Sequence, residues 1–198
     1  MTFKQKVQNI WDYDKWYILG GIVILICLFL FVKDVFFKEK VDVQVVSVAY
    51  GYLSKDQVET TEKVLSEFTE DINGDGKTTV NLLNIEFSPK NASRPQLDRE
   101  ANTQFMAEAS MQENCIFIID KTQFEKIWKE DYSSLTDLST LADFDENTYF
   151  IPISETALSE RLPFLDENLL FIVRIPYSQD AMGSYEEALK FARKLLNS

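Results

Sequence analysis

A run of seventeen residues without a charged side chain, at positions 16–32, is the feature that most constrains this chain. The run reads WYILGGIVILICLFLFV. As an α-helix rising about 1.5 Å per residue it measures roughly 25 Å, near the thickness of a bilayer's hydrocarbon core. Four aromatic residues stand at or just before its start, where amphipathic rings favour the lipid headgroup level: Trp11, Tyr13, Trp16 and Tyr17. A buried helix of a globular core is the alternative, but it needs no aromatic belt. The sequence therefore predicts a transmembrane helix over 16–32.

The segment after this run indicates that the anchor is not cleaved. Its sequence, VKDVFFKEK, has no small-residue pattern of the kind that signal cleavage requires. Cys27 follows Ile26, where a lipoprotein signal carries Gly, Ala or Ser, so lipid attachment is not expected either. We therefore predict a signal anchor and four regions: 1–15, a short cytoplasmic tail with interfacial aromatics; 16–32, the transmembrane helix; 33–40, a juxtamembrane linker; and 41–198, an extracytoplasmic α/β domain.

Strand patterns alternate with helical patterns from residue 41 to the end of the sequence. Apolar and β-branched segments predict strands at 41–51, 78–87, 115–120, 149–153 and 169–175. Capping boxes predict the starts of three helices: Ser54 with Gln57, Ser93 with Gln96, and Ser184 with Glu187. Shorter helices are expected at 121–128 and 155–162. The alternation predicts an α/β fold with a mostly parallel sheet that helices cover on both faces. Pro152 favours an edge position for the fourth strand or marks the end of that strand.

The negative charge of the protein is concentrated after the apolar run. The whole chain has a net charge of −12, and the residues from Lys33 onward sum to −13. An acidic domain repels phosphate backbones, and no compact Lys/Arg cluster offsets that repulsion. Nucleic-acid binding is therefore not predicted.

The residue types needed for the common catalytic arrangements are missing. The sequence has no histidine, which excludes Ser-His-Asp and Cys-His machinery. Both cysteines, Cys27 and Cys115, lie in apolar segments and are predicted to be small buried hydrophobes. Paired carboxylates, such as Asp143 with Asp145, are typical of a solvated acidic surface. A Ser-Lys dyad has no local sequence signature by which to find it. We predict that the protein is not an enzyme.

A calcium-type loop is the strongest candidate site in the sequence. The stretch DINGDGKTT, at 71–79, has oxygen-bearing side chains at positions 1, 3 and 5 of such a loop and glycine at position 6. The predicted ligands are the side chains of Asp71, Asn73 and Asp75, the backbone carbonyl of Lys77, and Thr79 or a water at position 9. The alternative is a plain Asp/Asn/Gly turn that ends a helix.

The loop departs from the EF-hand in two respects. Leu82 stands at position 12, where the bidentate glutamate belongs, and the loop runs from helix to strand. We therefore expect weak, structural Ca²⁺ binding, on the order of 10⁻⁴–10⁻³ M. The sequence Gly76-Lys77-Thr78 does not make a phosphate loop, because Asp71 replaces the first glycine and the order of strand and helix is reversed.

The order of elements resembles the first lobe of the solute-binding proteins that serve ABC transporters. A strand, a helix and a second strand lead to the long helix containing FMAEASMQEN. Then follow a strand ending in Asp (CIFIID), a short helix (KTQFEKIW), the segment SLTDLST, and YFIPIS, which looks like a crossing toward a second lobe. The resemblance covers 41–154, and only 44 residues remain after Ser154, too few for a second lobe.

The start of the chain is similar to membrane-anchored proteins of Gram-positive anaerobes that begin with an aromatic WDYxKWYI box. That likeness implies location rather than activity. Lysines are equally numerous on the two sides of the predicted span, so the positive-inside rule does not orient it. The calcium-type loop and the resemblance to extracytoplasmic proteins both favour a domain outside the cell membrane.

Together these patterns predict a membrane-tethered extracytoplasmic binding or adaptor module, similar to one lobe of a solute-binding protein. Its expected partners are the membrane and a transporter or receptor, and its small-molecule ligand is not specified by the sequence. The alternative is a calcium-stabilised cell-surface scaffold with no small-molecule ligand.

Overall fold

The computed structural model describes residues 16–17, 19–30, 41–89, 91–129 and 131–198. The chain divides into two units, Met1–Lys40 and Val41–Ser198. In the first unit, residues 16–17 and 19–30 are helical and exposed. No helix among the described residues combines the length and the apolar character that a membrane crossing requires. The predicted span 16–32 also includes residues 18, 31 and 32, which, like the predicted tail 1–15 and linker 33–40, lie outside the described residues.

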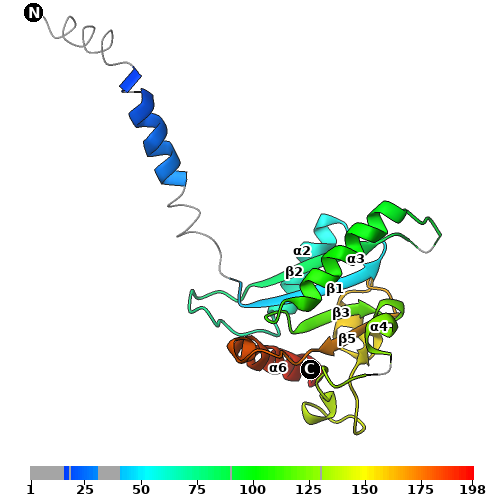
Figure 1. The fold of residues 1–198 in the computed structure, drawn as a ribbon. Coiled ribbons are helices and arrows are strands. Elements are labelled where there is room, and N and C mark those ends of the chain that lie inside the picture. Colours follow the sequence, from blue (N-terminus) through cyan, green and yellow to red (C-terminus); the bar gives the residue numbers. More distant parts are fainter. Residues whose placement is uncertain (1–15, 18, 31–40, 90, 130) are drawn as a thin grey trace, which may run out of the picture. The chain divides into compact units, whose positions relative to one another are not determined.

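The second unit is built on a mixed sheet. In the described residues five strands lie in the order β2-β1-β3-β5-β4 (Figure 1). Their bounds are β1 Val43–Tyr50, β2 Val80–Phe87, β3 Ile116–Asp120, β4 Ile151–Pro152 and β5 Leu169–Val173. The α-helices are α2 Lys55–Ser66, α3 Pro95–Ser110, α4 Lys121–Trp128, α5 Leu158–Arg161 and α6 Met182–Leu196. The described part of the unit also contains three 3₁₀ turns: η1 Leu138–Thr140, η2 Ile153–Glu155 and η3 Gln179–Ala181. The structure thus confirms the α/β class.

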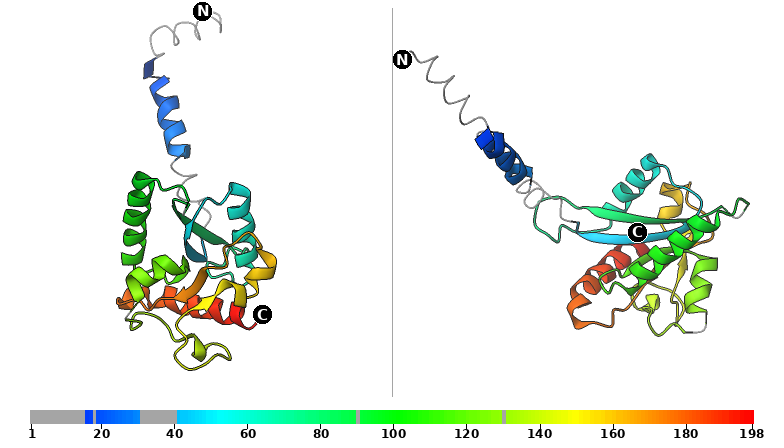
Figure 2. Two further views of the ribbon diagram at one scale, coloured as in Figure 1. Left: turned by 90° about the vertical axis from the view of Figure 1, so that its right-hand side faces the viewer. Right: turned by 45° about the horizontal axis from the view of Figure 1, so that its top comes forward.

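Helices cover both faces of the sheet, as predicted. Strand β1 pairs in parallel with β2 on one side and β3 on the other, so the chain reverses its direction of travel across the sheet after β2. Right-handed crossovers then require α2 and α3 to lie on opposite faces, as Figure 2 shows. Leu65 of α2 and Phe191 of α6 pack in the core on one face, and Phe105 of α3 and Phe124 of α4 pack in the core on the other.

The prediction of a mostly parallel sheet was wrong for its second half. Strand β5 pairs antiparallel with both β3 and β4. The segment 153–168 joins β4 to its neighbour β5 without a crossover that would carry the chain back to the end of the sheet where β4 begins, so the two strands run in opposite directions. Strand β5 is buried along its whole length. A continuous apolar run of this kind is equally compatible with either direction. The edge position expected for the strand with Pro152 is confirmed.

The capping boxes had mixed outcomes. The box of Ser54 and Gln57 is present at the start of α2, with both reciprocal hydrogen bonds. The other two were wrong. Helix α3 begins after Arg94 with Pro95 in its first turn, where proline's fixed φ suits the helix. Helix α6 continues from a 3₁₀ turn and starts at Met182, two residues before Ser184.

A buried arginine next to β5 forms hydrogen bonds with the carboxyl-terminal end of α3. Arg174 follows β5, is 4% exposed, and donates hydrogen bonds to the backbone carbonyls of Ala109 and Met111. These carbonyls belong to the last turn and C-cap of α3, where the helix dipole favours a positive charge. The guanidinium also lies 5.6 Å from the ring centre of Phe117. Burial lowers the pKa of Arg174, but a guanidinium stays protonated in proteins.

We predict that Arg174→Ala lowers the free energy of unfolding by about 2–4 kcal/mol, because two carbonyls lose their donors and a cavity forms. Urea unfolding followed by circular dichroism measures this loss. Arg161→Ala is the control, since exposed Arg161 forms an ion pair with Glu67 at 2.7 Å and should cost far less. Equal losses in the two variants would show that Arg174 does not stabilise α3.

Candidate functional site

The structure brings the three side-chain ligands predicted for calcium into one tight loop. The carboxylate of Asp71 accepts hydrogen bonds from the backbone N–H groups of Gly74 (2.7 Å), Asp75 (3.2 Å) and Gly76 (2.8 Å). The side-chain oxygen of Asn73 accepts from Asp75 N–H at 3.0 Å. Gly74 and Gly76 have φ of 73° and 83°, a region that side chains disfavour, so both glycines are needed for this path.

The later positions of the loop form hydrogen bonds with neighbouring elements of the domain instead. The carbonyl of Thr79 accepts from the N–H groups of Asp42 and Val43, at 2.9 and 3.4 Å, at the start of β1. Leu82 is 6% exposed, and its N–H donates to the carboxylate of Glu62 at 2.9 Å. Within the described ranges, no three Asp, Glu or Cys side chains converge in a group that could hold a metal ion. Calcium binding therefore stays a prediction.

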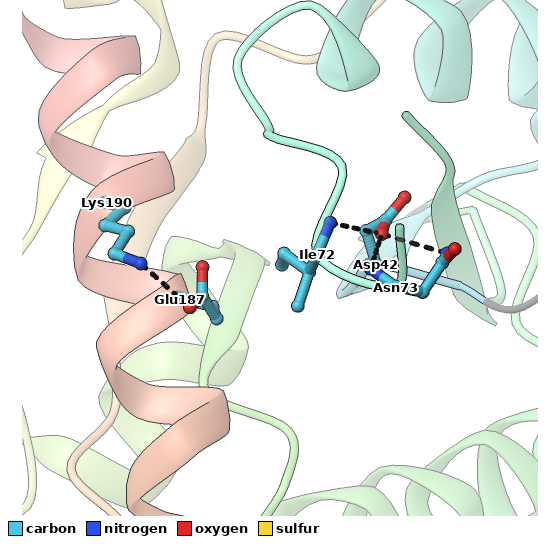
Figure 3. Close-up of polar contacts among 5 residues, drawn as sticks. All are labelled: Asp42, Ile72, Asn73, Glu187 and Lys190. Atoms are coloured by element: carbon cyan, nitrogen blue, oxygen red, sulfur yellow. Dashed lines mark hydrogen bonds and ion pairs between the residues drawn. The ribbon is translucent and has the colours of Figure 1, made fainter. Parts of the chain in front are cut away.

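Asp42, which the sequence did not single out, anchors this loop to the first strand (Figure 3). One carboxylate oxygen accepts from Ile72 N–H (2.8 Å), Asn73 N–H (3.1 Å) and the Asn73 side-chain amide (3.0 Å). The other oxygen accepts from Thr79 N–H at 2.8 Å. Burial acts to raise the pKa of Asp42, but the backbone N–H groups of Thr79, Asn73 and Ile72 together hold it below its ordinary value.

A cleft of about 390 Å³ lies beside this anchor, between the starts of β1 and β3 and the first turns of α6. Three of the polar side chains that line it are engaged within the protein. Asp42 binds the loop, Gln44 donates to Asn114 at 2.9 Å, and Glu187 pairs with Lys190 at 2.9 Å (Figure 3). These contacts use much of the polar lining, and the cleft lies at a boundary between packed elements.

A second cleft, of about 580 Å³, lies at the carboxyl ends of β1 and β2. This is the edge of the sheet beside which the order of the strands reverses, between β1 and β3, and α/β proteins bind ligands at such switch points. The lining residues come from the last positions of the two strands and from α3 and α4: Tyr50, Phe87, Asp98, Arg99, Asn102, Thr103, Gln123 and Lys126. We name this site the carboxyl-edge cleft.

Three polar side chains of the carboxyl-edge cleft are joined by hydrogen bonds. The buried side chain of Gln123 donates to the hydroxyl of Tyr50 at 2.8 Å and accepts from the ammonium of Lys126 at 3.0 Å. The rings of Tyr50 and Phe87 lie 5.7 Å apart and form an aromatic wall. Sequence reasoning missed these residues, although the ends of the first two predicted strands marked the place where such residues collect.

Cys115 does not contribute a reactive group. Cys115 is 2% exposed, as predicted, and burial raises the pKa of its thiol to about 11, with Arg174 acting in the opposite direction. A thiolate is therefore scarce there at neutral pH. The predicted burial of Cys27 was wrong for the described part of the protein, because its helix is exposed over residues 19–30.

Comparisons with protein-family models, with curated proteins and with solved structures gave no match.

We predict that Asp42 contributes stability that depends on pH. Because its folded-state pKa is lowered, this contribution is present above the unfolded value near pH 4 and is lost as the pH falls through the folded value. Asp42→Asn should lower the free energy of unfolding by about 1 kcal/mol at pH 6 and flatten its decline toward pH 3. Urea unfolding at several pH values measures both effects. Asp143→Asn, at an exposed carboxylate, should behave like the native protein, and a native-like Asp42→Asn would refute the anchor.

Proposed function

We propose that residues 41–198 form a non-catalytic binding or adaptor module, tethered outside the cell membrane by the segment 16–32, that acts beside a transporter or receptor. The carboxyl-edge cleft is the observation that carries this proposal. It lies at the carboxyl ends of the parallel strands β1 and β2, next to the point where the order of the strands reverses, and its volume is in the range of small-molecule sites.

The order of its lining supports recognition of a solute. A ligand site combines an apolar wall with a few fixed polar groups. The Tyr50–Phe87 ring pair supplies the wall, and Gln123 holds the ammonium of Lys126. Asn102 and Thr103 add exposed hydrogen-bonding groups from α3. The described cleft residues include neither cysteine nor histidine, and recognition needs neither.

The tether and the adaptor role rest on the sequence. The uncharged run and its aromatic flank favour an anchor. The resemblance to one lobe of a solute-binding protein favours a partner that supplies what the second lobe supplies in that family. A single lobe beside a permease or receptor accounts for both features.

Filling the carboxyl-edge cleft should abolish solute binding without unfolding the domain. Asn102 lies on the exposed side of α3 and lines the cleft, so Asn102→Trp places a large ring over it. The full-length protein in detergent is screened by thermal shift against amino acids, sugars, organic acids and polyamines. A ligand that binds the folded state raises the melting temperature by mass action, and this rise should vanish in the variant.

Gln104→Trp is the matched control, because Gln104 is exposed on the same helix but does not line the cleft. Its thermal shifts should equal those of the native protein. The proposal fails if no solute stabilises the native protein, if both variants respond alike, or if the protein turns over a substrate. The proposed location outside the cell membrane is refuted if protease added outside intact cells cannot cleave the domain.

The second candidate is a calcium-stabilised surface scaffold, which the loop at 71–79 favours. Its side-chain oxygens are already gathered by backbone N–H groups, so little ordering would be needed on binding. The carboxylates retain acceptor capacity beyond these hydrogen bonds. Asp42 ties the same loop to β1, so a cation there would stabilise the entry to the domain.

Calcium should raise the melting temperature of the full-length protein by a few degrees. At a Ca²⁺ concentration about ten times the dissociation constant, mass action contributes about 1.4 kcal/mol. Asp75→Asn removes one of the two loop carboxylates but keeps an acceptor for Lys77 N–H, and it should abolish the shift. The exposed Asp143→Asn should leave the shift unchanged. An equal response to Mg²⁺, or a shift that survives Asp75→Asn, would contradict a calcium site in this loop.

A further inference from the structure

The carboxyl-edge cleft has a charge opposite to that of the domain around it. Residues 41–198 contain 14 Lys and Arg against 28 Asp and Glu, a net charge of −14. Among the described residues, three side chains that are charged at neutral pH line the cleft: Asp98, Arg99 and Lys126. The carboxylate of Asp98 accepts the N–H of Ser88 at 2.8 Å, so part of its capacity is used inside the protein. Two cations and one engaged carboxylate therefore face the cleft.

The cations are available to a ligand. Neither Arg99 nor Lys126 forms an ion pair with a carboxylate among the described residues. The ammonium of Lys126 donates to the side-chain oxygen of Gln123 at 3.0 Å and lies 5.9 Å from the ring centre of Phe87. An ammonium has three N–H donors, so this geometry leaves donors for an anion. Gln123 is 2% exposed and also binds Tyr50, which fixes the position of the ammonium.

The aromatic side chains of the cleft favour a ligand with an apolar part. Tyr50, which is half-buried, and Phe87, which is 5% exposed, line the cleft with tilted rings 5.7 Å apart, so the Tyr50 ring offers most of the apolar surface on which another ring or an apolar chain packs favourably. Asn102 and Thr103 lie exposed on α3 at the rim. A bare inorganic anion would make no contact with the aromatic side chains. A cation would be repelled by the positive charges of Lys126 and Arg99.

We propose that the carboxyl-edge cleft binds a small organic anion, with its carboxylate or phosphate on Lys126 and Arg99 and its apolar body against Tyr50 and Phe87. This inference rests on the proposed binding function and names its ligand class. In a domain of charge −14 the general field opposes anions, so the local cations and the wall must supply the attraction. Recognition then requires both parts of the ligand.

Benzoate, phenyl phosphate and the neutral benzyl alcohol are suitable probes, titrated calorimetrically into the full-length protein in detergent. Benzoate or phenyl phosphate should bind, and benzyl alcohol should bind at least tenfold more weakly. The tighter of the two anions indicates whether the site prefers a carboxylate or a phosphate. Lys126→Met should weaken anion binding at least tenfold, and Lys126→Arg should retain most of it. Lys55→Met, at an exposed lysine of α2, should have no effect.

Melting curves of each variant show whether it is folded, and Lys126→Arg tests the charge independently of Lys126→Met. The inference is overturned if neither anion binds at about 10 mM, if benzyl alcohol binds as tightly as benzoate, or if Lys126→Met leaves affinity unchanged. If a neutral or cationic solute binds and Asn102→Trp abolishes that binding, the assignment of an anionic ligand is overturned but the binding function stands. Absence of binding by every solute in the panel would overturn the binding function as well.

Discussion

Strand β1 can exist only if both of its faces and both of its edges are covered, and the rest of the domain meets that requirement. Val45, Val46 and Val48 are fully buried. Val45 packs in the core on one face, and Val46 and Val48 pack in the core on the other. Parallel pairing with β2 and β3 satisfies the backbone on both edges. Because the neighbours lie on opposite sides of β1, the helices that lead to them must lie on opposite faces.

The parts of the fold that could be predicted were those set by local pattern. The β-branched run of β1 and the capping box of Ser54 each depend on residues close in sequence, and both predictions agree with the structure. The direction of β5 depends on where the segment 153–168 lies in space, which its sequence does not encode locally. Ser93 and Ser184 carry the composition of a cap, but Pro95 and the turn before Met182 decide where those helices begin.

The same division applies to the candidate sites. The Asp, Asn and Gly spacing of 71–79 predicted a tight turn lined by oxygens, and the structure gathers Asp71, Asn73 and Asp75 there. Its anchor, Asp42, is about thirty residues away in the chain, and only parallel pairing of β1 with β2 brings the two together. The contact between Gln123 and Tyr50 joins residues 73 apart, again through the sheet. Such pairs have no signature in a single sequence.

The loop and the carboxyl-edge cleft lie at opposite ends of β1, and this separation limits how one could influence the other. Asp42 precedes the first residue of the strand and Tyr50 is its last, so roughly 25 Å of rigid, buried backbone divides them. A cation at the loop would stabilise the end where the chain enters the domain, while a solute would bind at the far end. Coupling between distant sites needs an element with two discrete arrangements. A central strand paired on both edges is poorly suited to that role. The two proposed sites are therefore expected to act independently of each other.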